Sequence, residues 1–110
     1  MIEETLAGVV ERFNRHADQN PALHQELAGL VRTIAVRITD ESQYALDLKG
    51  GRLESLRTGA VSHADITITT DAATFLGLVN REIGPMKALV TRRLAIEGSL
   101  EDKLLFRRLF

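Results

Sequence analysis

Apolar residues recur at helical spacing near the start of the chain. One face of a helix would carry Ile2, Leu6, Val9, Val10 and Phe13, with charged residues over much of the remaining surface. The dipeptide Asn20-Pro21 is typical of a helix start, with asparagine as the N-cap and proline at the first helical position. The pattern therefore predicts an amphipathic helix followed by a short second helix over about residues 22–30.

The apolar period then changes to two, which is the period of a half-buried strand. Alternate apolar residues form two runs, Ile34, Val36, Ile38 and then Tyr44, Leu46, Leu48. Next comes Lys49-Gly50-Gly51-Arg52, whose glycines tolerate the positive φ angles of a tight hairpin. A third strand over about 52–57 alternates more weakly, as an edge strand would, and 58–63 is expected to be a loop.

The second half of the chain begins with a fourth strand over 65–70, which alternates cleanly. Thr70 or Asp71 is expected to cap a following helix. Gly84-Pro85 interrupts that helix before a second helical piece. This helical connection permits the next strand either to pair in parallel or to change its position in the sheet.

The chain closes with a short fifth strand and a last helix. The strand covers Leu94 to Glu97 and ends at Gly98, and Ser99 to Asp102 resembles a capping box. The predicted order is α-α-β-β-β-β-α-α-β-α over a single domain, residues 1–110. Because polar residues alternate on every strand, helices should cover one face of the sheet, which indicates an α+β fold.

Composition and charge narrow the function classes. The 14 basic and 15 acidic residues give a formal charge of −1, without the basic excess of a nucleic-acid-binding protein. The lack of cysteine excludes disulfides and thiolate chemistry. No stretch reaches the ~20 apolar residues of a membrane span, and the first residues do not resemble a signal peptide. We therefore expect a cytoplasmic protein.

Candidate catalytic or metal-binding groups are few. His16, His24 and His63 have no metal-binding spacing, and surface positions explain them better. His63 and Asp65 lie two residues apart, which allows a hydrogen-bonded pair, although no nucleophile accompanies them. Phosphate-binding and nucleophile-elbow motifs are also missing. The sequence thus predicts no catalytic residue, metal or cofactor, and favours a protein that is not an enzyme.

Large apolar residues crowd into the last third of the chain. From Phe75 to Phe106 there are fourteen of them within about thirty residues. One interpretation is an ordinary core, which periodicity alone favours. The other is that some of them line a cavity for an apolar ligand beneath the two helical pieces.

Three segments of this region together resemble the sterol carrier protein domain, also called the sterol-binding or non-specific lipid-transfer domain. They are Ala64-Asp65-Ile66-Thr67-Ile68-Thr69, Glu82-Ile83-Gly84-Pro85-Met86-Lys87-Ala88-Leu89 and Leu94-Ala95-Ile96-Glu97-Gly98. The specific part of the resemblance covers about 64–105, and the earlier elements match in order. The chain is similar to prokaryotic-type stand-alone members.

The resemblance implies a five-stranded mixed sheet with helices on one face. It also implies an apolar tunnel between the sheet and the later helices for fatty acyl, sterol-like or prenyl lipids, with no catalytic residue or metal. Carried over to this sequence, the lining residues would be Phe75, Leu78, Val79, Met86, Leu89, Val90, Ile96, Leu100 and Leu104. The role implied is that of a lipid carrier or presenter.

The chain departs from the family at two positions where glycine is usual, Arg81 and Arg92, so the local backbone is expected to differ there. The run from Arg92 to Gly98 resembles bacterial members that assist isoprenoid-quinone synthesis. Alternative interpretations are therefore an accessory protein of quinone metabolism, or a structural homodimerisation module with a filled core. The apolar and cationic residues 104–110 also suggest transient contact of the C-terminal helix with a membrane surface.

Overall fold

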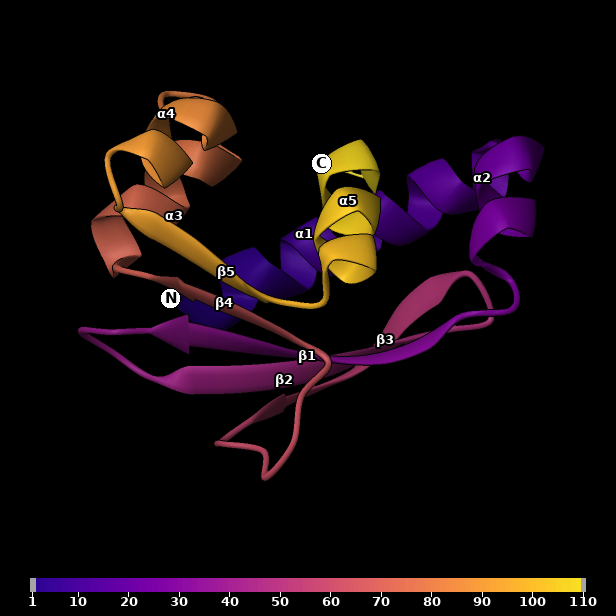
Figure 1. The fold of residues 1–110 in the computed structure, drawn as a ribbon, viewed down its shortest axis with the longest axis horizontal. Helices are drawn as coiled ribbons and strands as arrows, with labels where there is room; N and C mark the ends of the chain where they lie inside the picture. Colours follow the sequence, from indigo (N-terminus) through magenta and orange to yellow (C-terminus); the bar gives the residue numbers. More distant parts are fainter. Residues whose placement is uncertain (1, 110) are drawn as a thin grey trace.

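The computed structural model describes the backbone of residues 2–109 and the side chains of residues 2–105. Its elements are α1 (Ile2–Gln19), α2 (Pro21–Leu27), β1 (Val31–Ile38), β2 (Gln43–Lys49), β3 (Arg52–Thr58), β4 (Ile66–Thr70), α3 (Ala72–Val79), α4 (Pro85–Val90), β5 (Leu94–Gly98) and α5 (Leu100–Leu109). This confirms the predicted order and fold class. Figure 1 shows the helices on one side of the sheet, with the β3–β4 connection running beneath it.

The five strands form one mixed sheet in the order β3-β2-β1-β4-β5. β1 pairs antiparallel with β2 and parallel with β4, whereas β5 pairs antiparallel with β4. The helical connection from β4 to β5 therefore joins an antiparallel pair. Two successive helices carry the chain away from the end of β4 and back to it, so that Leu94 lies opposite Thr70. The parallel pair arises instead from the connection beneath the sheet.

The strand registers place the alternating apolar residues on the face under the helices. Ile34 of β1 lies opposite Leu46 of β2 and Ile66 of β4, and all three side chains are buried. They belong to the main core, which also includes Ile2, Leu6, Phe13, Leu27, Val36, Ile38, Tyr44, Leu48, Leu53 and Leu105. The apolar period of two thus reports the burial of one sheet face.

Element ends differ from the expected ones by a few residues. α2 ends at Leu27 rather than near residue 30, because a turn bonds the Leu30 N–H to the Leu27 carbonyl. β1 begins at Val31, before the apolar alternation starts, because Val31 already pairs with Lys49 through the backbone. Backbone pairing does not require buried side chains, so a strand end outside the apolar alternation is hard to see in the sequence.

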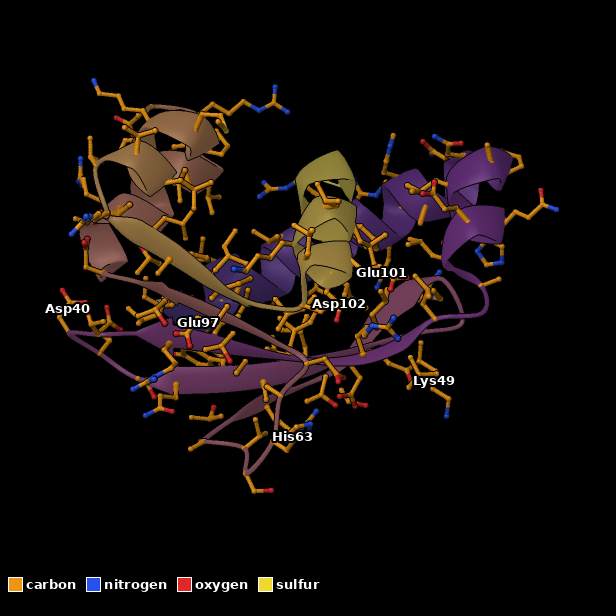
Figure 2. The ribbon with its side chains drawn as sticks, viewed as in Figure 1. Asp40, Lys49, His63, Glu97, Glu101 and Asp102 are labelled. Atoms are coloured by element: carbon orange, nitrogen blue, oxygen red, sulfur yellow. The ribbon has the colours of Figure 1, made fainter. Side chains whose placement is uncertain are left out.

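A partly buried ion pair fixes α5 on the sheet. The Ser99 hydroxyl oxygen accepts a hydrogen bond from the Asp102 N–H at 3.0 Å, which confirms half of the predicted capping box. The Asp102 carboxylate binds the Arg32 guanidinium of β1 at 2.8 Å and points toward the sheet in Figure 2. This hydrogen bond raises the pKa of Arg32 above its ordinary value. Beside it, Leu105 is buried in the core.

Among the described residues, no helix is both long enough and apolar enough to cross a membrane.

Candidate functional site

The candidate site is built on α3 and α4, which follow β4 and return the chain to β5 (Figure 1). Asp71 is the N-cap of α3, and its carboxylate accepts hydrogen bonds from the backbone N–H of Thr74 at 2.7 Å and from its hydroxyl at 2.9 Å. The same hydroxyl accepts a bond from the Arg93 Nε–H at 3.1 Å. Thr74 is fully buried, so this network ties the start of α3 to the entry of β5.

α3 ends in a Schellman motif that folds the chain back on the helix. The Glu82 N–H donates to the Gly77 carbonyl and the Arg81 N–H to the Leu78 carbonyl, the bonds that define this motif. Ile83 then packs on Gly77 so closely that a Cβ there would lie 2.6 Å from an Ile83 side-chain carbon. The absence of a side chain at Gly77 therefore sets the path from α3 to α4.

α4 ends in the same way, with Arg92 in the position of Arg81. The Arg93 N–H donates to the Ala88 carbonyl and the Arg92 N–H to the Leu89 carbonyl. Arg81 and Arg92 have φ angles of 60° and 62°, in the left-handed region that favours glycine. The expected local difference in backbone is thus not found. The chain keeps a glycine-like conformation at both arginines, and such a residue costs about 1–2 kcal/mol of strain.

The nine residues expected to line a ligand site fall into two groups. Four are half-buried: Phe75, Leu78, Val79 and Ile96. Of these, Phe75 and Ile96 also pack against the main core. Ile96 lies opposite Ile68 of β4 on the face of the sheet that the helices cover. These four residues come from α3 and β5 and form the inner part of the candidate site.

The other five residues are exposed, namely Met86 (56%), Leu89 (36%), Val90 (77%), Leu100 (73%) and Leu104 (52%). In α4 the buried residue is Ala88, and Met86 and Val90 lie about 160° around the helix from it. Among the described side chains of α5, the buried ones are those of Asp102 and Leu105. The structure therefore does not bring these five side chains into the half-buried group.

The sequence did not predict that Ala88 is the buried residue of α4. Ala88 is completely buried, whereas the larger residues on either side of it are exposed. In an apolar helix of six residues, periodicity does not distinguish the inner face, because apolar residues stand on nearly every side. The one signal available in the sequence was that Ala88 is small whereas its neighbours are large. A small residue permits close packing of the helix against the rest of the protein.

The titratable side chains that the structure describes do not form a second site. The Asp65 carboxylate accepts the Thr33 backbone N–H at 2.8 Å, and no hydrogen bond joins it to His63, which is exposed in the loop beneath the sheet (Figure 2). Within the described part of the chain, no cluster of His, Asp or Glu residues has the arrangement of a metal site. A hollow of about 460 Å³ lies at the turn between β1 and β2, and Arg37, Glu41, Gln43 and Ala60 are among its lining residues.

The fold, the one-sided helices and the apolar residues of α3 and β5 agree with a match in sequence. Residues 10–110 match the SCP-2 sterol transfer family. The chain belongs to that family. Among curated proteins, none matches the sequence of this SCP-2 chain.

Known structures share the SCP-2 fold at low sequence identity. A UbiJ-SCP2 ubiquinone synthesis protein is 19% identical with a TM-score of 0.63, over 94% of this chain and 85% of that one. Sterol Carrier Protein 2 Like 2 from Aedes aegypti is 18% identical with a TM-score of 0.61, over 94% and 96%. The sec-alkylsulfatase PisA1, as a double mutant, is 21% identical with a TM-score of 0.65, over 79% of this chain but only 14% of its own.

Replacing Arg92 by glycine should stabilise this SCP-2 chain. Glycine relieves the left-handed strain at φ 62°, and we expect a gain of about 1 kcal/mol in the free energy of unfolding. Urea denaturation with an unchanged m-value measures it. Lys87→Gly is the matched control, because it removes a cation from the interior of α4 and should destabilise by about 1 kcal/mol. Equal effects of the two substitutions would contradict the account.

The cap of α3 should make stability depend on pH. The hydrogen bond from the Thr74 backbone N–H lowers the pKa of the Asp71 carboxyl below its ordinary value of 3.8. Asp71→Ala should cost about 1 kcal/mol at neutral pH. The deficit should shrink as the pH falls from about 4 through the lowered folded pKa, because the wild-type carboxylate is then protonated.

The control for this cap is Asp71→Asn, whose amide oxygen still caps the helix but does not titrate. It should retain most of the stability at neutral pH. A deficit of Asp71→Ala that stays constant into acid would refute the assignment. Denaturation curves recorded over a pH series measure both variants.

Proposed function

We propose that this chain binds an apolar ligand, of fatty acyl, sterol-like or prenyl type, and acts as its carrier or presenter. The observation that carries the proposal is that none of the nine candidate residues is fully buried, whereas the alternating residues of β1 and β2 are. Exposed apolar surface costs about 25 cal/mol per Å². A ligand covering the candidate residues other than Met86 and Val90 would recover that free energy.

The proposed binding site is centred on the half-buried group Phe75, Leu78, Val79 and Ile96, with Leu89, Leu100 and Leu104 at its rim. Membership of the SCP-2 sterol transfer family supports a lipid as the ligand. A related structure is that of palmitated SCP2L2 from Aedes aegypti, which is 18% identical and supports a fatty acyl chain as a first ligand to test. The proposed role is binding without catalysis, in the cytoplasm.

Direct analysis of the purified protein tests the proposal. Solvent extraction followed by mass spectrometry should release a lipid in an amount comparable to the protein. A fluorescent fatty acid should bind and be displaced by unlabelled fatty acid. A protein that carries no lipid and binds no fluorescent fatty acid would overturn the proposal and favour the filled-core homodimer instead.

Substitution of one inner residue should weaken binding. Leu78→Asn places a polar group in the half-buried apolar cluster, and we expect about a tenfold rise in the Kd for the fluorescent fatty acid. The matched control is Val31→Asn, because Val31 is 63% exposed on β1. Both variants are first compared by urea denaturation. Identical affinities in two folded variants would exclude Leu78 from the site.

A second candidate is presentation of an isoprenoid-quinone precursor to the enzymes that modify it. The observation in its favour is the similarity to a UbiJ-SCP2 ubiquinone synthesis protein over 94% of this chain. Deletion of the gene should then lower cellular quinone and accumulate a precursor. Unchanged quinone levels would reject this version while leaving general lipid binding intact.

The predicted membrane contact of the C-terminal helix stays a prediction. The side chains of residues 106–110 lie outside those that the structure describes. Vesicle co-sedimentation with and without these residues tests that contact.

A further inference from the structure

α4 presents its large apolar side chains away from the protein. Ala88 is the buried residue of this helix, and Met86 and Val90, on the opposite side of the helix, are 56% and 77% exposed. Burial of the Met86 and Val90 side chains would be favourable, because it would remove apolar surface from water. A helix with its apolar side outward therefore indicates a surface that contacts something else.

Cations surround this apolar side. Residues 80–93 hold four basic side chains and one acidic one, a net charge of +3, whereas the rest of the chain holds ten basic and fourteen acidic residues, a net charge of −4. Arg81, Lys87 and Arg92 are all exposed, and no hydrogen bond or ion pair joins these three side chains to another side chain among those described. Positive charge is thus concentrated where the exposed apolar residues are.

Two of these cations stand at positions that disfavour them. Arg81 and Arg92 have left-handed φ angles and end α3 and α4 where glycine would be unstrained. Strained residues that persist in a fold are a reason to look for function. Here the two strained residues place a guanidinium at each end of the segment that carries Met86 and Val90.

From these three observations we infer that α4 with its flanking arginines docks on the surface of an anionic lipid bilayer. Met86 and Val90 enter the boundary between headgroups and acyl chains, and Arg81, Lys87 and Arg92 contact anionic headgroups. A purely apolar partner would not account for the cations, and an acidic partner in water would not account for the apolar side chains. In this arrangement Met86 and Val90 contact the bilayer rather than the bound ligand.

The test is vesicle flotation with the full chain at low and at physiological salt. Vesicles of roughly one part phosphatidylglycerol to two parts phosphatidylcholine should bind the protein, and pure phosphatidylcholine vesicles should not. Each cation near an anionic surface contributes about fivefold in partitioning, so Arg81→Gly with Arg92→Gly should weaken binding about 25-fold. Salt should weaken the wild-type binding in the same direction.

The double variant is informative because two properties move in opposite directions. Its stability should rise, since glycine relieves the strain, so weaker vesicle binding is not explained by unfolding. Met86→Gln with Val90→Gln should also reduce binding, because it removes the apolar side chains that enter the bilayer. Since both side chains are exposed and support no core, these substitutions should leave the fold intact. Arg37→Gln with Lys49→Gln is the control with the same change of charge, and Figure 2 shows Lys49 far from α4. It should bind within about twofold of wild type.

Three results would overturn the inference. They are no binding of the wild type to anionic vesicles, equal loss in the control pair, and a self-associating wild type that Met86→Gln with Val90→Gln renders monomeric without any vesicle binding. The last would assign α4 to a homodimer. Binding of the fluorescent fatty acid by Arg81→Gly with Arg92→Gly, measured without membranes, should remain at the wild-type level. Lipid binding and bilayer docking therefore succeed or fail separately.

Discussion

The parallel pairing of β1 with β4 joins the two halves of the chain, and the candidate site depends on it. Ile34 to Ile38 lie in register with Ile66 to Thr70. Asp65 closes the start of this ladder, because its N–H donates to the Thr33 carbonyl and its carboxylate accepts the Thr33 N–H. Since β1 also pairs with β2, one strand carries both halves of the sheet. β4, which leads into the helices of the site, is attached to β1 through this ladder.

The helices that follow β4 are fixed at both ends by hydrogen bonds. Asp71 caps α3, its Thr74 network reaches Arg93, and both α3 and α4 end in Schellman motifs. α4 buries only Ala88. Because Met86 and Val90 of α4 are exposed, they contribute little to the core and stay accessible from outside the protein. Arg81 and Arg92 belong to these helix ends. Their left-handed backbone lowers the stability of the fold, and their side chains add exposed positive charge.

The strands and helix starts were predictable because each has a local physical signature. Alternation marks the buried face of β1 and β2, and Asn20 and Asp71 supply the caps that begin α2 and α3. The parallel β1–β4 pair was not predictable, because the connection beneath the sheet has no periodic pattern. Nor was the outward side of α4, since its inner residue is the small Ala88. The sequence identified Arg81 and Arg92 as positions where glycine is usual. It did not predict that both residues keep the left-handed backbone conformation, because this conformation depends on packing.

We propose that an apolar ligand contacts the half-buried residues of α3 and β5. The most direct measurement is an NMR experiment on the protein with an isotope-labelled fatty acid, filtered for contacts between protein and ligand. We expect nuclear Overhauser effects from the acyl methylenes to the methyl groups of Leu78, Val79 and Ile96. A bound fatty acid that shows contacts elsewhere and none to these three residues would contradict the proposal.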